Sequence, residues 1–190
     1  MIEEAKNKGV KHISLKATDM GRTFVEGAYM DIILEKVEEC KKDVLYRLLQ
    51  YSLFEESLSD QNDMNEDALF EYPWFENYFI EEGRDACFIK EQGTGKLLGF
   101  VMINTYVQKC DSGHSIAEFM VLPKFRRNKI GKKAAFACFE RYMGNWEVSP
   151  SYGSEQAYLF WKNVINEYVG KNNQYEDGIF LFSNCNKARK

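Results

Sequence analysis

One segment constrains the fold of this chain more than any other, because four signals follow one another over residues 115–143. Residues 115–122 read SIAEFMVL, an apolar run that is typical of a strand, and Pro123 ends it. A turn with many Lys and Arg residues comes next. Residues 130–143 then read IGKKAAFACFERYM, with apolar or small side chains at helical spacing. The segment therefore predicts a strand that leads through a basic turn into a helix.

The same periodicities place the other elements. Helices are predicted over residues 44–58, 75–80, 130–143 and 154–169. Strands are predicted over residues 30–34, 87–90, 97–107, 115–122, 145–148 and 179–183. Gln92–Gly95 is expected to close a β-hairpin, Ser154 to be a helix N-cap and Gly144 a C-cap. This order predicts an α/β (or α+β) fold with a mixed central β-sheet flanked by helices.

Composition sets the class of protein. The chain has 190 residues, of which 45% are hydrophobic and 28% charged, as expected for one globular domain with an appendage. Its five cysteines are scattered and odd in number, which indicates reduced thiols and a cytoplasmic protein. With only His12 and His114 present, we expect no metal site. Neither a transmembrane helix nor a signal peptide is expected, since long apolar runs are missing.

Charge is distributed unevenly. Residues 124–133 read KFRRNKIGKK and carry six basic side chains and no acid, whereas the net charge of the chain is −4, so the remainder carries −10. A basic turn at a helix N-terminus, where free N–H groups add positive potential, is a suitable site for a phosphate. A solvated basic turn is the alternative. The acidic remainder argues against a nucleic-acid surface.

Residues 118–131, EFMVLPKFRRNKIG, resemble motif A of the GNAT N-acetyltransferases, a strand followed by (Q/R)-x-x-G-x-(G/A) at a helix start. Arg126 matches the first position and Gly131 the last, whereas Lys129 replaces the middle glycine. A left-handed Lys or a shifted loop has to do what glycine does freely there.

Residues 157–161, AYLFW, resemble the A-x-x-F-(Y/W) of a later helix in that family, with Ser154 where Asn is frequent. Residues 145–148 and 69–74 resemble a branch of predicted bacterial acetyltransferases. The resemblance covers residues 30–184 and implies a GNAT-like fold.

The resemblance also implies acetyl transfer from acetyl-CoA to a primary amine, by direct attack in a ternary complex. The strand backbone at Met120, Val121 and Leu122 would pair with the pantetheine arm. The turn that would hold the pyrophosphate comprises Arg126, Arg127, Asn128, Lys129, Ile130, Gly131 and Lys132. The later helix would add Ser154, Phe160 and Trp161 to the cofactor site.

For the chemistry, Glu118 is the first candidate for the general base, with a structural ion pair as the alternative. Simple alternation puts His114, Ile116, Glu118 and Met120 on one face of their strand. The family's usual general acid is a Tyr at the position of Trp161, and an indole N–H cannot protonate a thiolate. Tyr158, water or no specific acid remain as alternatives.

Partners and rival functions stay open at this stage. A non-catalytic acyl-CoA-binding or regulatory module on the same fold is the main alternative, and a homodimer is compatible with the sequence. We expect neither nucleic acid nor a membrane as a partner. Residues 55–85 contain eleven acids and one base, which either form a solvated face or attract a cationic amine. The identity of that acceptor is not encoded in any motif.

Residues 1–29 form a separate question. Gly9–Gly27 resembles the strand, loop and helix near the carboxyl end of a GNAT domain, and Met30 looks like a natural start. The hypothesis is that residues 1–29 are the remnant of an upstream acetyltransferase ahead of the domain at 30–190. A native extra strand and helix is the alternative.

Overall fold

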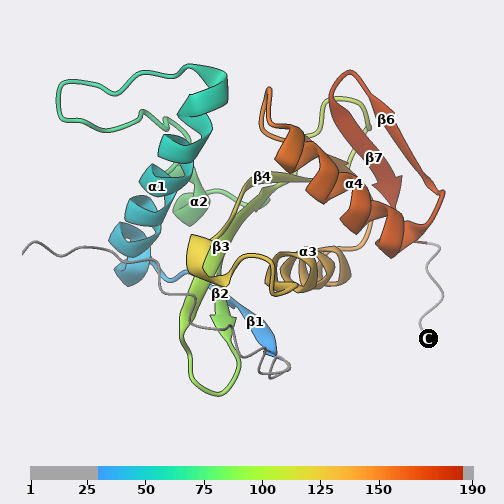
Figure 1. Cartoon of the computed structure of the whole chain (residues 1–190), viewed down its shortest axis with the longest axis horizontal. Coiled ribbons are helices and arrows are strands. Elements are labelled where there is room, and N and C mark those ends of the chain that lie inside the picture. Colours follow the sequence, from blue (N-terminus) through green and yellow to red (C-terminus); the bar gives the residue numbers. More distant parts are fainter. Residues whose placement is uncertain (1–29, 186–190) are drawn as a thin grey trace, which may run out of the picture.

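A seven-stranded β-sheet between two helical layers organises the protein (Figure 1). The computed structural model describes residues 30–185. The strands are β1 (Ile32–Lys36), β2 (Arg84–Glu91), β3 (Leu97–Asn104), β4 (His114–Val121), β5 (Asn145–Val148), β6 (Asn173–Glu176) and β7 (Ile179–Ser183). The helices are η1 (Glu39–Lys41), α1 (Lys42–Asp60), α2 (Asn77–Ile80), η2 (Pro123–Phe125), α3 (Ile130–Arg141) and α4 (Glu155–Val169).

The strand order in the sheet is β1-β2-β3-β4-β5-β7-β6. Every neighbouring pair is antiparallel except β4 and β5, which run parallel. These two strands pair only over His114–Ile116 and Trp146–Val148. Beyond Ile116 the two strands no longer pair, because β5 ends at Val148, so the rest of β4 has a free edge on this side.

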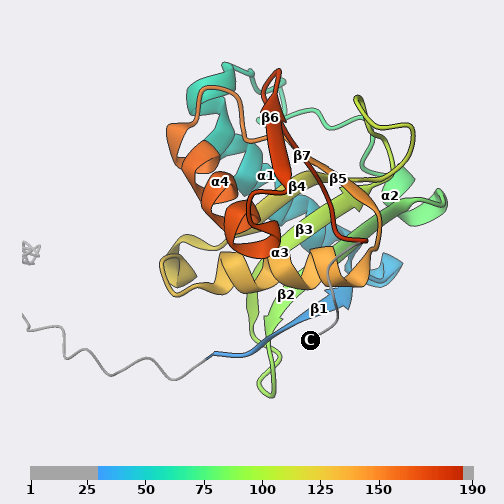
Figure 2. The same cartoon turned by 90° about the vertical axis from the view of Figure 1, so that its right-hand side faces the viewer.

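Each face of the sheet has its own core. On one face Leu45 and Leu49 of α1 pack with Phe100 and Met102 of β3. On the other, Phe139 of α3 lies in a cluster with residues of α4, β5 and β7. Figures 1 and 2 show the same division, with α1 and α2 on one side of the sheet and α3 and α4 on the other.

The predicted fold class, hairpin and strand–turn–helix segment are confirmed. Ser154 is an N-cap, because its Oγ accepts a hydrogen bond from the N–H of Ala157 over 3.2 Å. Gly144 is not the C-cap of α3: Tyr142 is, and the buried Asn184 side chain bonds the carbonyls of Phe139 and Tyr142. Strand β6 was not predicted.

The predictions about residues 1–29 lie outside the described residues. Between residues 30 and 185, no helix combines the length and apolar character needed to cross a membrane.

Candidate active site

A β-bulge in β4 decides where the predicted base points. Met102 of β3 pairs with Glu118, but Ile103 pairs with Ile116, so Ala117 is an extra residue in β4. Ile116 therefore packs in the core under α3 and α4, whereas Met120 packs in the core under α1. Simple alternation through the strand was wrong, and Glu118 lies on the α1 face of the sheet with Met120.

Glu118 lies among acidic and aromatic neighbours on that face. Its carboxyl group is half-buried, and Tyr72 is one of the neighbours that act on its pKa. Desolvation and the nearby carboxylates of Glu56 and Asp60 raise the pKa of Glu118 to about 8, against the Tyr72 hydrogen bond, which lowers it. A carboxylate with such a pKa is a stronger base than an ordinary one, and its ionised fraction accepts a proton near neutral pH.

Glu56 connects α1 with the far side of the site. Its Oε1 accepts a hydrogen bond of 3.5 Å from the hydroxyl of Ser52, and Ser151 in the β5–α4 loop acts to lower the pKa of Glu56. Burial raises the pKa of Glu56, and Asp60 raises it further. Two carboxyl groups with raised pKa values, Glu56 and Glu118, therefore lie beside one another where β4 and β5 diverge.

The free edge of β4 offers backbone groups to a ligand. The N–H of Leu122 donates to the carbonyl of Leu98 over 2.8 Å, so alternate residues of β4 bond to β3. The backbone groups of Phe119 and Val121 consequently point to the opposite edge, where the described part of β5 has already ended. One of them, the Val121 carbonyl, accepts a hydrogen bond of 2.7 Å from Arg126 Nε.

The turn that follows has an unusual backbone for its residues. Arg127 and Lys129 have φ angles of 64° and 61°, the left-handed region that favours glycine. Lys129 is thus left-handed, one of the two ways in which a lysine can occupy the place of the motif's middle glycine. The helical ladder of α3 begins with Lys133 N bonded to Lys129 O, so the preceding amides lie ahead of it.

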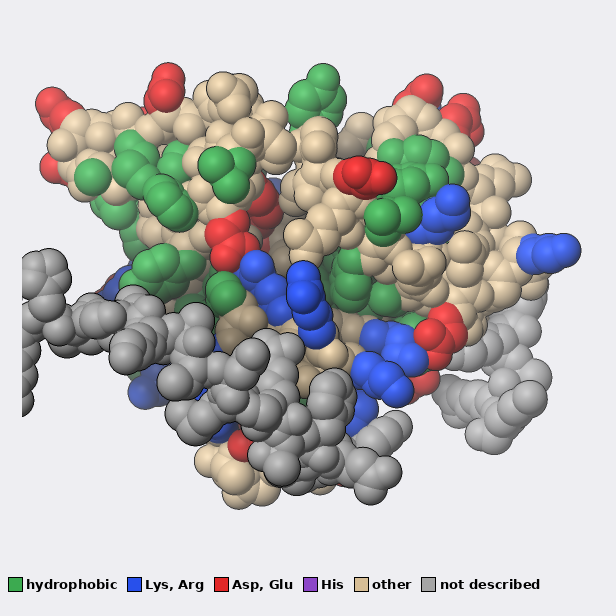
Figure 3. All heavy atoms as spheres, viewed as in Figure 1, with side chains coloured by type: hydrophobic (Ala, Val, Ile, Leu, Met, Phe, Trp, Pro, Cys, Tyr) green, Lys and Arg blue, Asp and Glu red, His purple; other side chains and the backbone are tan. Residues whose placement is uncertain are grey.

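The basic side chains of the turn differ in their partners. Arg126 Nη2 lies 2.5 Å from Glu55 of α1, and Lys132 Nζ lies 2.6 Å from Glu167 of α4. Arg127 and Lys129 are exposed and form no ion pair with any residue in 30–185. Figure 3 shows Lys and Arg side chains gathered at a hollow between the α1 half and the α4 half of this face, with acidic side chains on the α1 side.

Helix α4 packs against β4 beside the free edge of that strand. Phe160 stacks on Phe119 of β4 with ring centroids 5.8 Å apart, and Trp161 meets Phe119 edge-on at 5.0 Å. A Cβ on Gly131 would lie 3.1 Å from the Phe160 ring, so a larger residue there would require that ring to move by a few tenths of an ångström. The structure thus brings Phe160, Trp161, Gly131 and the β4 edge together.

Tyr158 lies elsewhere on α4. Its ring packs against Tyr175 and Phe180, with centroid distances of 5.1 and 5.6 Å. Those residues belong to β6 and β7, and β7 is separated from β4 by β5. The structure therefore does not bring Tyr158 into contact with Glu118 or with the free edge of β4. Cys138 of α3 lies fully buried in the core.

Sequence reasoning missed Tyr72, Glu56 and Asp60 as neighbours of Glu118. Glu56 did carry a signal: it lies four residues after Ser52 on the face of α1 that also holds the buried Leu45 and Leu48. A carboxylate on an apolar helix face is worth singling out. Tyr72 carried none, because a contact between residues 46 positions apart leaves no local pattern.

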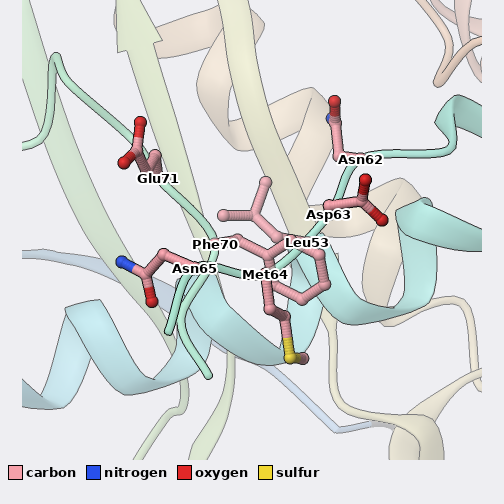
Figure 4. Close-up of a pocket in the computed structure, with 7 residues that line it drawn as sticks. All are labelled: Leu53, Asn62, Asp63, Met64, Asn65, Phe70 and Glu71. Atoms are coloured by element: carbon pink, nitrogen blue, oxygen red, sulfur yellow. The ribbon is translucent and has the colours of Figure 1, made fainter. Parts of the chain in front are cut away.

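A separate hollow of about 330 Å³ lies under the segment between α1 and α2 (Figure 4). Apolar and polar side chains share its lining, namely Leu53, Asn62, Asp63, Met64, Asn65, Phe70 and Glu71. None of the predicted site residues is among them. One of the lining residues, Glu71, directly precedes Tyr72 in the chain.

Comparison with known proteins identifies the family. The sequence model of the acetyltransferase (GNAT) family matches residues 50–152, just over half of the chain. No curated protein sequence matches the chain.

Solved structures share the fold at low sequence identity. An acetyltransferase from Thermus thermophilus is 13% identical, with a TM-score of 0.55 over 80% of this chain and 94% of that one. The glucosamine N-acetyltransferase region of a fungal multi-domain GH3 beta-N-acetylglucosaminidase is 12% identical, with a TM-score of 0.51. That match covers 78% of this chain but only 17% of the fungal protein.

Proposed function

The chain belongs to the acetyltransferase (GNAT) family, and from this we propose that it transfers an acetyl group from acetyl-CoA to a primary amine. The observation that carries the proposal is the place of Glu118. This half-buried carboxyl group, with a pKa of about 8, lies two residues beyond the point where β4 and β5 diverge. Glu118, the proposed proton acceptor, therefore lies next to the free edge of β4.

The residues present fit acetyl-CoA. The backbone groups of Phe119 and the N–H of Val121, which face the free edge of β4, suit the amides of a pantetheine arm, as in strand addition. The amides from Arg127 to Lys132 precede the helical ladder of α3 and suit a pyrophosphate. Arg127 and Lys129 supply positive charge with no competing ion pair in the described chain. Phe160 and Trp161 form an apolar wall beside the same edge.

When bound, acetyl-CoA would supply the activated acetyl group. Glu118 would accept the proton of the attacking amine, directly or through water, and its raised pKa means that it gains basicity as it loses solvation. The edge N–H groups of β4 are the available donors for a carbonyl oxygen. We assign the proton for the departing thiolate to solvent, because Tyr158 packs against β6 and β7.

The acceptor is proposed to be a cationic amine. Glu56 and Asp60 lie on the α1 side of Glu118, and acidic residues outnumber basic ones by eleven to one over residues 55–85. Such a wall raises the local concentration of an ammonium ion. We further propose that the protein acts in the cytoplasm, in keeping with five free cysteines.

Calorimetric titration with acetyl-CoA tests the binding site. We expect Arg127→Glu to weaken the affinity about tenfold or more, the scale of one lost charge-assisted hydrogen bond plus repulsion. Lys41→Glu, a reversal at an exposed lysine ahead of α1, is the control and should leave the affinity unchanged. Arg126 is a poorer probe, because its reversal also breaks the pair with Glu55.

Turnover separates the two functions that the fold allows. A panel of primary amines is incubated with acetyl-CoA, and the release of free thiol is measured. Release with any amine, lost in Glu118→Gln, supports the proposal. Binding of acetyl-CoA without turnover would identify a non-catalytic acyl-CoA module. Equal affinity of Arg127→Glu and the unaltered protein would exclude the proposed phosphate site.

A further inference from the structure

We propose that Glu55 of α1 is a positioning residue for the basic turn at residues 126–129, and that it acts through Arg126. The inference rests on the proposed function, in which this turn and the start of α3 hold the pyrophosphate of acetyl-CoA. It gives Arg126 a role other than phosphate binding, and it assigns a role to an acid that no sequence motif identified.

The turn is a short segment between two fixed ends. Before it, Phe125 is buried and lies in one core cluster with Ile130, the first residue of α3. Between these ends, Arg127 and Lys129 have left-handed φ angles of 64° and 61°, which cost free energy for any residue with a Cβ. Further contacts are therefore needed to hold residues 126–129 in this shape.

Arg126 supplies the side-chain bonds of this segment. Its Nε donates to the Val121 carbonyl over 2.7 Å, which ties the turn to the end of β4. Its Nη2 donates to Oε2 of Glu55 over 2.5 Å, which ties the turn to α1. By contrast, the side chains of residues 127–129 are exposed and make no hydrogen bond within residues 30–185. One guanidinium therefore links the turn to two other elements.

The end of α1 that carries Glu55 is itself anchored. Leu48 and Ser52, which lie earlier on the helix, are buried. Ser59, one turn after Glu55, lies against the loop between β5 and α4, since a Cβ on Gly153 would lie 3.4 Å from the Ser59 Cβ. Residues four apart share a helix face, so Glu55 is on the side of α1 that meets the other half of the site.

The cations of the turn consequently divide into two kinds. The guanidinium of Arg126 already has a carboxylate partner in Glu55. Arg127 and Lys129 have no such partner within residues 30–185, so they are the cations available to a phosphate. Figure 3 shows this meeting of charges, with acidic side chains of the α1 half close to Lys and Arg side chains at the hollow.

The sign of one change separates this role from simple electrostatics. Glu55 carries a negative charge close to a turn that would hold an anion, so Coulomb's law alone predicts that its removal strengthens acetyl-CoA binding. If Glu55 holds Arg126 in place, its removal lets the strained turn relax. Binding then weakens, because the ligand has to order the turn again.

Calorimetric titration of the full-length protein with acetyl-CoA measures that sign. We expect Glu55→Gln to weaken the affinity about threefold to fivefold, the range of a partly exposed ion pair, while Tm moves by no more than about 3 °C. The matched control is Glu167→Gln, which frees Lys132 from a pair of 2.6 Å that has no link to β4. It should leave the affinity unchanged or raise it.

A second variant tests whether the two residues act as a unit. Arg126→Lys keeps the charge but loses the planar fork that bonds two partners at once. We expect it to weaken binding as much as Glu55→Gln does, and the double variant to lose no more than either single variant.

Nitrogen-15 NMR of the free protein provides a readout that needs no ligand. The backbone amide signals of residues 127–129 should shift in Glu55→Gln and stay in place in Glu167→Gln. Tighter binding by Glu55→Gln, additive losses in the double variant or unmoved amide signals would each overturn the inference. Failure of the unaltered protein to bind acetyl-CoA would instead refute the proposed function, and the amide signals would still show whether Glu55 holds the turn.

Discussion

Lys129 holds a backbone conformation that costs an ordinary side chain about 1 kcal/mol, and it does so at the first turn of α3. Its φ of 61° and that of Arg127, 64°, give the turn the shape that glycine usually provides. The strain is retained beside a helix N-terminus, where backbone amides gather. Lysine at this position adds a positive charge, and in exchange the backbone is held in a conformation that glycine would adopt without strain.

Lys129→Gly should therefore raise the free energy of unfolding by about 0.5–1 kcal/mol, because strain relief exceeds the entropy that glycine gains in the unfolded chain. Urea denaturation measures the change. Lys129→Ala is the matched control, since it removes the same cation but keeps the left-handed φ, and it should not stabilise. Equal stability of the two variants would contradict this account.

At the scale of elements, regular patterns were readable from the sequence and interruptions were not. The strand at 115–122 and the helix at 130–143 appear as β4 and α3 because their apolar residues repeat at the expected spacing. The bulge at Ala117 carries no residue signal, since alanine fits a regular strand as well. Strand β6 reads NQYE and escaped notice because its side chains are mostly exposed.

The candidate site shows the same division. Motif A located Glu118, Gly131 and the basic turn, all within one short segment. The neighbours of Glu118 come from α1 and from the chain before α2, and only tertiary packing brings them there. The side chain of Asn184, 42 positions beyond Tyr142, bonds the end of α3 in place of the expected glycine cap. Capping rules consider only neighbouring residues and cannot predict a partner so far along the chain.

Glu147 holds the loop between β3 and β4. The carboxylate is 2% exposed and accepts N–H bonds from Gln108, Lys109 and Cys110 at 2.7, 2.7 and 2.8 Å. Burial acts to raise its pKa, but the three backbone donors outweigh burial and lower it. Because the folded pKa lies below the unfolded one, this stabilisation is complete above the ordinary value of 4.5 and is lost as the pH falls through the folded pKa.

We expect Glu147→Gln to cost about 2 kcal/mol at pH 7, since an amide cannot accept three N–H bonds as a carboxylate does. The difference in unfolding free energy between Glu147→Gln and the unaltered protein should become smaller at acidic pH. Thermal unfolding between pH 3 and pH 7 measures both effects. Glu140→Gln, at an exposed position of α3, is the control and should change little. A stability difference between the two proteins that does not change with pH would contradict this role of the Glu147 carboxylate.

At the scale of the whole molecule, the chain just ahead of β1 is bound to the rest of the domain. The carbonyl of Met30 accepts from Lys133 Nζ over 2.7 Å, and the carbonyl of Asp31 accepts from Gln92 N over 2.8 Å. Residues from this point supply every strand of the seven-stranded sheet. From the sequence resemblance we propose that the domain starts at Met30, with residues 1–29 as an added segment.

A chain that starts at Met30 should fold, with a Tm within about 3 °C of the full chain, and should bind acetyl-CoA with the same affinity. Circular dichroism and calorimetry on the two chains provide the comparison. Loss of folding or of binding in the shorter chain would reject the hypothesis that residues 1–29 are a remnant.

The extra residue in β4 has a consequence for changes of length. Side chains alternate between the two faces of the sheet on either side of Ala117, and the alternation shifts by one position across it, so Ile116 and Glu118 face opposite layers. Deleting Ala117 would restore a regular strand and leave Glu118 opposite Met102, on the α1 face. A strand that kept all its residues but lost the bulge would instead turn either Ile116 or Glu118 to the opposite face.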